Sequence, residues 1–205
     1  ISYRNDTFLT MAVKQSNIEL LQLCLVNLKD QQIFDEVSIK NPFVYAIKTH
    51  NLGIFNAFLD YFGDNITKQT SQINYGLSLL LEDYYYDAND RNNRPNDSSR
   101  KSFYQSDDFI NFMKRLFEVN NFDLNISYRN DTFLTLAIKQ SNLELLQLCL
   151  ENIKDQQIFD EMSIKNPFIY AIKTHNLDIV NAFIDYFGDN ISKRTSQINY
   201  GLTLL

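Results

Sequence analysis

The chain of 205 residues is 44% hydrophobic and 21% charged, a balance typical of a folded chain with a substantial core and not of a disordered one. Its formal net charge of −6 argues against a nucleic-acid partner, because binding to phosphates needs clustered Lys and Arg. No apolar run approaches the roughly 18 residues that a spanning helix needs, so the sequence predicts no membrane span.

Two short amphipathic helices are predicted at the start of the chain. Leu9, Met11 and Ala12 place one apolar stripe on the first helix, and Ser16 follows it at a position that favours a left-handed residue. The second helix has an inward stripe formed by Leu20, Leu21, Cys24 and Leu25. Neither helix can bury its stripe alone, so we expect an all-α fold of stacked helix–turn–helix units.

The same pair recurs 34 residues later. Residues 40–48 align with residues 6–14, and residues 51–59 align with residues 17–25. Pro42 falls at a first helical position, where its missing N–H costs nothing, and His50 takes the place of Ser16 at the turn. A period of this length is typical of helical repeat proteins.

A third unit follows, with its inner helix predicted at residues 74–80 and its outer helix at residues 109–118. The predicted small-residue positions of the inner helices are spaced 34, 32, 59, 34 and 32 residues apart: Ala12, Ala46, Ser78, Ala137, Ala171 and Thr203. The wide spacing indicates an insert at about residues 82–106, which we expect to form either an ordered flap or a flexible loop.

The chain then repeats itself: residues 126–205 align with residues 1–80 without a gap and differ at 13 of 80 positions. The predicted organisation is helix–turn–helix repeats 1 and 2 at 1–73, repeat 3 at 74–125, repeats 4 and 5 at 126–198, and the start of repeat 6 at 199–205. Because residues 202–205 lack the polar face of a terminal repeat, we expect a fragment of a longer array.

These motifs resemble degenerate ankyrin repeats. Residues 7–12 resemble the start of the ankyrin consensus, residues 17–21 its second helix, and residues 120–125 its ending. Thr10 stands where the consensus has His, and Ser16 stands where it has Gly. The resemblance implies an ankyrin-like α-solenoid of about five to six units.

By the same resemblance, the partner would be another protein, bound by inter-unit loop tips and the inner-helix face. The implied contact residues are Tyr3, Arg4, Asn5, Asp6, Tyr128, Arg129, Asn130 and Asp131 in the tips, and exposed Lys14, Lys48, Lys139 and Lys173 on the helices. The insert adds candidates because tyrosines suit interfaces: Tyr84, Tyr85 and Tyr86. The alternatives are a solvated surface for the tips and lysines, and packing on the adjacent helix for the tyrosines.

Little in the sequence suggests catalysis. His50 and His175 are interpreted as helix-terminal turn residues, and Cys24 as a buried, inert thiol instead of a nucleophile. The acidic pairs at 35–36 and 160–161 fall in polar connectors, and no phosphate-binding loop, nucleophile elbow or zinc pattern occurs. We therefore expect no enzyme activity, metal, cofactor or small-molecule ligand.

Three hypotheses about function follow. The first is a non-catalytic protein–protein interaction scaffold in the cytoplasm, the location that two reduced cysteines favour. The second is a targeting arm of a larger enzyme or of a secreted effector, for which the host cytosol is the expected location. The third is a structural spacer, which predicts no binding partner at all.

Overall fold

A computed structural model describes residues 7–28, 31–89, 106–119, 123–153, 156–163 and 165–205, with the side chains of 84–89 outside the described part. Over these residues the chain is helical, and no strand forms beyond one isolated bridge between Tyr128 and Asp131. The predicted all-α class is confirmed. Contacts divide the chain into two compact units, Ile1–Asp123 (unit 1) and Leu124–Leu205 (unit 2).

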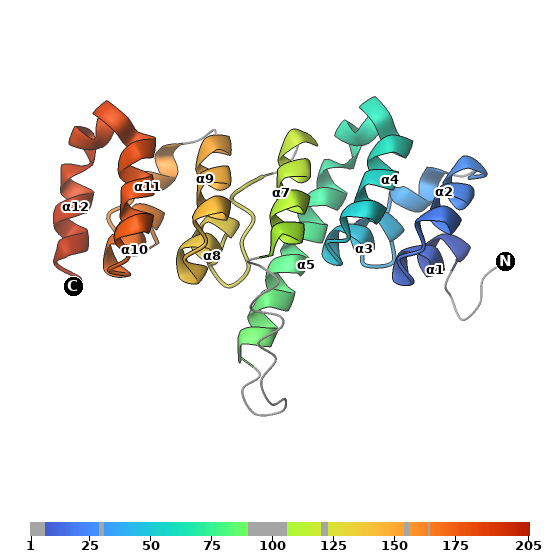
Figure 1. Cartoon of the computed structure of the whole chain (residues 1–205), viewed down its shortest axis with the longest axis horizontal. Coiled ribbons are helices and arrows are strands. Elements are labelled where there is room, and N and C mark those ends of the chain that lie inside the picture. The colour runs from blue at the N-terminus through green and yellow to red at the C-terminus, as the bar shows by residue number, and fades with distance from the viewer. Residues whose placement is uncertain (1–6, 29–30, 90–105, 120–122, 154–155, 164) are drawn as a thin grey trace. The chain divides into compact units, whose positions relative to one another are not determined.

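Unit 1 holds three helix pairs arranged in two layers. In one layer α3 lies between α1 and α5, and in the other α4 lies between α2 and α7 (Figure 1). The helices and 3-10 turns are α1 (Phe8–Lys14), α2 (Ile18–Val26), η1 (Gln31–Phe34), α3 (Pro42–Lys48), α4 (Leu52–Phe62), η2 (Gly63–Gln69), α5 (Thr70–Asn89) and α7 (Asp107–Val119).

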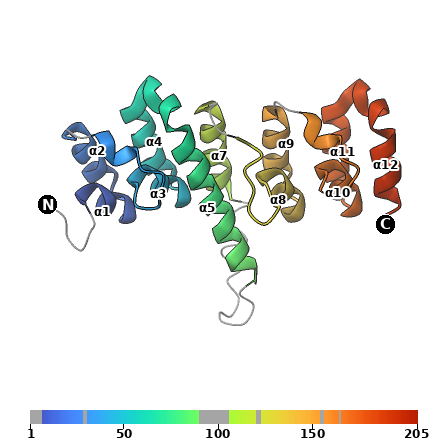
Figure 2. The same ribbon diagram turned by 180° about the vertical axis from the view of Figure 1, so that it is seen from behind.

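Unit 2 repeats this arrangement with fewer helices. Here α10 contacts both α8 and α12 in one layer, and α9 contacts α11 in the other (Figure 2). The elements are α8 (Phe133–Gln140), α9 (Leu143–Asn152), η3 (Gln156–Phe159), α10 (Pro167–Lys173), α11 (Leu177–Phe187), η4 (Gly188–Arg194) and α12 (Thr195–Leu202).

Each predicted helix–helix turn is closed by a residue in the left-handed region. The φ angles are 54° at Ser16, 47° at His50, 53° at Ser141 and 58° at His175, as the sequence predicted for these positions. An asparagine then caps the outer helix by accepting a backbone N–H through its side chain, which ends the turn and starts the next helix: Asn17, Asn51, Asn142 and Asn176.

Phenylalanines fill the space between the layers. In unit 1 the ring of Phe43 lies 5.4 Å from that of Phe58, and the ring of Phe62 lies 5.0 Å from those of Phe34 and Phe43. Such tilted and edge-on pairs stabilise a core beyond the area that they bury. Unit 2 repeats the cluster with Phe159, Phe168, Phe183 and Phe187.

The third helix pair differs from the prediction. α5 begins at Thr70 and not at residue 74, and it continues through Tyr84–Tyr86 to Asn89, so the first part of the predicted insert is helix (Figure 1). Residues 90–105, the rest of the insert, lie outside the described part. α7 confirms the outer helix predicted at 109–118. In unit 2, α12 likewise begins before residue 199, at Thr195.

The close contact between inner helices falls on a different residue from the one predicted. Ser78 is only half-buried, whereas a Cβ added to Gly76 would lie 2.8 Å from the Cβ of Ile47. In unit 2 a Cβ added to Gly201 would lie 2.9 Å from Cδ1 and 3.1 Å from the Cβ of Ile172. Glycine is therefore required where α5 crosses α3 and where α12 crosses α10.

Candidate functional site

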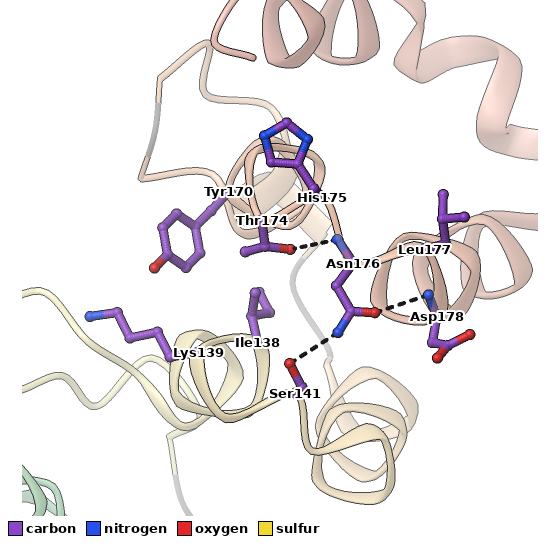
Figure 3. A pocket seen from close by; sticks show the side chains of 9 residues that line it. All are labelled: Ile138, Lys139, Ser141, Tyr170, Thr174, His175, Asn176, Leu177 and Asp178. Carbon is purple, nitrogen blue, oxygen red and sulfur yellow. Dashed lines mark hydrogen bonds between the residues drawn. The ribbon is translucent and has the colours of Figure 1, made fainter.

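The candidate site is a groove of about 750 Å³ on unit 2, where the C-terminal ends of α8 and α10 meet the start of α11 (Figure 3). Five of its lining residues are exposed, so the groove is open to solvent. The lining mixes cationic, anionic, hydroxyl, amide and apolar groups: Ile138, Lys139, Ser141, Tyr170, Thr174, His175, Asn176, Leu177 and Asp178.

Asn176 forms the floor of the groove and connects two successive helix pairs. Its Oδ1 caps α11 by accepting the N–H groups of Asp178 at 3.1 Å and Ile179 at 3.3 Å. Its Nδ2 donates to the Oγ of Ser141 at 3.0 Å, across to the end of α8 (Figure 3). One side chain therefore holds both walls of the groove in register.

The turn between α10 and α11 is also fixed by side chains. Thr174 Oγ1 donates to the carbonyl of Ala171 at 2.7 Å, and the N–H of His175 donates to that of Ile172 at 3.2 Å. These bonds place the exposed imidazole of His175 at the groove's edge and leave Tyr170 half-buried on its wall. The groove is thus rigid at its base and lined by side chains available for contact.

A two-residue turn precedes α8. The backbone N–H groups of Tyr128 and Asp131 each donate to the carbonyl of the other, at 2.9 and 3.0 Å. The two residues between them, Arg129 and Asn130, have φ angles of 51° and 70°, as a type I′ turn requires. Both are exposed, so this tip presents an Arg and an Asn to solvent.

An ion pair ties this turn to the groove. Asp131 is buried, and both of its carboxylate oxygens accept from Lys139 Nζ, at 2.5 and 2.7 Å. Thr135 Oγ1 donates a further bond to the same carboxylate at 3.3 Å. Lys139 also lines the groove. The Asp131 carboxylate offsets the positive charge of Lys139 on the side that faces the turn, and this ion pair holds the turn beside the groove.

The other predicted contact residues have different surroundings. Lys14 and Lys173 are exposed as predicted, whereas Lys48 is half-buried and lies 3.2 Å from the carboxylate of Asp83. Tyr128 is half-buried, and the Arg129 guanidinium lies 5.6 Å from the centre of its ring. Outside the described part lie the first turn and the side chains of the tyrosine cluster: Tyr3, Arg4, Asn5, Asp6, Tyr84, Tyr85 and Tyr86.

The residues of unit 1 that correspond to those of the groove keep the central hydrogen bond but differ in exposure. Asn51 Nδ2 donates to Ser16 Oγ at 3.0 Å, and Asn51 Oδ1 caps α4. His50 is half-buried, and this burial lowers its pKa to about 4, against a smaller raising effect from the backbone of Lys48. Gly53 stands in the place of Asp178, so unit 1 has no carboxylate at this position.

The remaining titratable candidates lie in structural positions. Cys149 is buried as predicted, and its burial raises the pKa of the thiol to about 12. Cys24 was predicted to be buried but is only half-buried. Asp160 is exposed and pairs with Arg194, whose guanidinium lies 5.2 Å from the centre of the Phe187 ring. Within the described ranges, no three His, Cys, Asp or Glu side chains gather as a metal site would require.

Sequence reasoning missed most of the groove. Of the residues that line it, only Lys139 was predicted as a contact residue, and His175 was interpreted only as a turn residue. A signal was present, because the Thr-His-Asn-Leu sequence occurs in both copies at the junction of an inner and an outer helix. The change from Gly53 to Asp178 also marked this junction as a place where the copies differ.

Comparisons with protein-family models, with curated proteins and with solved structures find no match for this chain. Among the residues that the structure describes, no helix is both long enough and apolar enough to cross a membrane. The function is therefore argued from the site alone.

Proposed function

We propose that this chain is a protein–protein interaction scaffold built from ankyrin-like repeats, and that it acts through the groove and turn of unit 2 without catalysis. The observation that supports this proposal is the groove itself, with its base held by Asn176 and its open walls lined by an imidazole, a carboxylate and a phenol. Partner-binding grooves combine a rigid base with a few such polar groups among apolar ones.

The two-layer packing supports the ankyrin-like part of the proposal. Inner helices lie side by side in one layer, and the outer helices return in the other; a left-handed residue joins α1 to α2, α3 to α4, α8 to α9 and α10 to α11. The turn at Tyr128–Asp131 precedes α8, where the resemblance to ankyrin repeats implies a loop tip between successive repeats. An inner-helix face beside such a turn is the contact surface implied by the resemblance. We place the scaffold in the cytoplasm.

Quantitative affinity capture tests the proposal with a matched pair of variants. Charge reversal of two exposed residues that frame the surface, Arg129→Glu with Asp178→Lys, keeps the net charge of the chain. The control is Val26→Asp, because Val26 is 84% exposed on the outer layer of unit 1.

We expect proteins captured by the wild-type chain and by the control to be lost from the charge-reversed variant. Recovery of the same proteins with all three chains would reject the groove as the binding surface. An absence of enriched proteins with the wild-type chain would favour a spacer over a scaffold.

A further inference from the structure

Unit 2 holds a guanidinium group beside two aromatic rings at the turn η4. Arg194 Nη1 donates to a carboxylate oxygen of Asp160 and, at 3.2 Å, to the carbonyl oxygen of Phe159. The guanidinium carbon lies 5.2 Å from the centre of the Phe187 ring and 6.0 Å from that of the Phe159 ring. The side chain of Arg194 is only 13% exposed. The cation is therefore held by a carboxylate, a carbonyl and two rings.

The groups that surround this guanidinium have identical counterparts in unit 1: Phe34, Asp35 and Phe62. The rings of Phe34 and Phe62 lie 5.0 Å apart at an angle of 76°, and those of Phe159 and Phe187 lie 5.2 Å apart at 87°. The turns η2 and η4 both begin at a glycine with a positive φ angle, 49° in unit 1 and 47° in unit 2. The duplication has therefore preserved the geometry that receives the cation.

The cation itself is missing from unit 1, because Gln69 stands in the place of Arg194. Within the part of the chain that the structure describes, the exposed Asp35 forms no ion pair. The buried Oε1 of Gln69 and the buried hydroxyl of Tyr61 have no hydrogen-bond partner there either. A buried polar atom without a partner costs free energy, so such atoms mark a place where a hydrogen-bonding group is lacking.

The backbone carbonyl at the centre of each site shows the effect of this substitution. The Phe34 carbonyl accepts from Gln72 Nε2 at 2.9 Å. The Phe159 carbonyl accepts from Gln197 Nε2 at 3.3 Å and also from Arg194. The glutamine thus lies closer to the carbonyl where the arginine is missing. The Oε1 atoms of both glutamines lack a partner, so these atoms do not distinguish the two units.

We propose that this part of unit 1, the η1–η2 site (Phe34, Asp35, Phe62 and Gln69), binds the guanidinium group of an arginine side chain that a partner polypeptide supplies. Asp35 accepts hydrogen bonds from the guanidinium, which packs against the two rings as Arg194 does in unit 2. Gln69 moves aside and offers its Oε1 as a further acceptor.

The chemistry of the η1–η2 site favours arginine over lysine. A guanidinium is planar, more weakly hydrated than an ammonium group and packs well on aromatic rings. The formal net charge of −6 also favours a cationic partner. The proposal goes beyond the groove of unit 2 and does not depend on it, because the two share no residue.

Nuclear magnetic resonance of the full ¹⁵N-labelled chain tests the proposal, with a blocked Ala-Arg-Ala tripeptide as the probe. We expect the peptide to shift the signals of Asp35 and Gln69 saturably and to leave those of Asp160 unchanged. The same peptide with Lys in place of Arg is expected to bind several-fold more weakly. Asp35→Asn should weaken binding at least about fivefold, because it removes the carboxylate that faces the guanidinium. Asp160→Asn, the matched control in unit 2, should leave binding to unit 1 unchanged.

Two exchanges between the copies make the test specific. Gln69→Arg supplies the cation from within the chain, as in unit 2, so it is expected to abolish peptide binding in a chain that circular dichroism shows to be folded. Arg194→Gln removes the cation from unit 2, so the peptide is then expected to shift the signals of Asp160 as well. A merely structural role for Gln69 and Arg194 would not create this second binding site.

Free L-arginine distinguishes a small molecule from a polypeptide as the source of the guanidinium. Glu36, next to Asp35, is exposed and would repel the free carboxylate, so we expect L-arginine to bind at least about threefold more weakly than the blocked peptide. Equal or tighter binding of L-arginine would overturn the polypeptide as the source. Equal binding of the Arg and Lys peptides would overturn the guanidinium as the ligand. An absence of shifts at Asp35 and Gln69, or shifts that Gln69→Arg leaves unchanged, would overturn the site itself.

Discussion

At the scale of single residues, one buried asparagine organises the connector before α3, and its copy organises the connector before α10. Asn41 is 1% exposed and makes three hydrogen bonds: Nδ2 donates to the carbonyls of Phe34 at 2.9 Å and Glu36 at 2.8 Å, and Oδ1 accepts from the N–H of Phe43 at 2.9 Å. Asn166 repeats all three bonds in unit 2. The connector is therefore held by a side chain that no consensus motif singled out.

We expect Asn41→Ala to lower the free energy of unfolding by about 3 kcal/mol, because it leaves buried backbone groups without their partner. Asn41→Asp is expected to be at least as damaging at pH 7, since a carboxylate would face two carbonyl oxygens. Urea unfolding followed by circular dichroism measures both. Asn65→Ala, at an exposed position, is the control and should stay within about 0.5 kcal/mol of wild type. An equally small change for Asn41→Ala would contradict this role.

The burial of His50 predicts a dependence of stability on pH. Its pKa is about 4 in the folded chain and near 6.5 when exposed, so between these values the unfolded state binds the proton and the folded state does not. This contribution is neutral above pH 6.5, and stability falls as the pH drops from 6.5 towards 4.

His50→Asn keeps a side chain that tolerates the left-handed backbone and removes the titration. We expect its unfolding free energy to fall less steeply between pH 6.5 and 4 than that of wild type, in urea titrations at several pH values. Asn65→Ala, which changes no titratable group at an exposed position, is expected to retain the wild-type slope. Parallel curves for wild type and His50→Asn would show that His50 does not cause the dependence.

Both cysteines were predicted to be buried thiols, and the structure shows that they differ in exposure. Cys149 is fully buried with a pKa of about 12, whereas Cys24 is half-buried, although burial raises its pKa too. We expect one thiol to react with Ellman's reagent in the native chain at pH 8 and the second only in urea. Cys24→Ser should remove the native reaction. Equal rates for both thiols would contradict the burial of Cys149.

At the scale of elements, two of the substitutions between the two copies fall at neighbouring positions of packed helices. A Cβ at Gly53 on α4 would lie 2.6 Å from Ile18 Cδ1 on α2. In unit 2 the corresponding pair is Asp178 and Leu143. Asp178 has the Cβ that Gly53 lacks, and its neighbour Leu143 is branched at a different carbon from Ile18. The two differences looked independent in the sequence, and only the contact between the helices connects them.

A double-mutant cycle tests this coupling. We expect Gly53→Asp alone to lower the free energy of unfolding, because it forces the Ile18 side chain to shift. The double variant Ile18→Leu with Gly53→Asp is expected to have a free energy of unfolding about 0.5–1 kcal/mol higher than the sum of the two single effects predicts. The readout is the urea midpoint at constant m-value. Additive single effects would mean that the two sites accommodate their changes separately.

The sequence predicted the short helices well and the long helix poorly. α1, α3, α8 and α10 follow apolar stripes that end just before Ser16, His50 or their copies, where the backbone must become left-handed. The outer helices α2, α4, α9 and α11 follow the stripes predicted after these turns. α5 begins in a polar stretch at Thr70, without an apolar stripe to mark it. It continues through Tyr84–Tyr86 because neither Gly nor Pro occurs between Leu77 and Arg94 to stop it. The groove was not predicted, since it depends on contacts between residues 35 positions apart, which the repeated Thr-His-Asn-Leu sequence marks but does not specify.

At the scale of the whole molecule, the contacts are concentrated within unit 1 and within unit 2. In a chain of stacked repeats each helix pair is stabilised mainly by its neighbours. A substitution that destabilises one pair therefore destabilises other pairs only when the interfaces between them are strong. Asn41 and Asn166 make the same hydrogen bonds in different units. Equivalent substitutions at these two residues can therefore destabilise either unit separately.

Hydrogen exchange read by mass spectrometry measures how far such damage spreads. We expect Asn166→Ala to speed exchange in α10, α11 and α12 while α3 and α4 retain wild-type protection, and Asn41→Ala to give the reverse. The two copies yield distinguishable peptides because they differ at 13 positions. An equal rise in both units for either variant would show that the chain opens as one cooperative body. Separate opening would mean that a partner bound to the groove of unit 2 stabilises that unit and leaves the exchange of unit 1 unchanged.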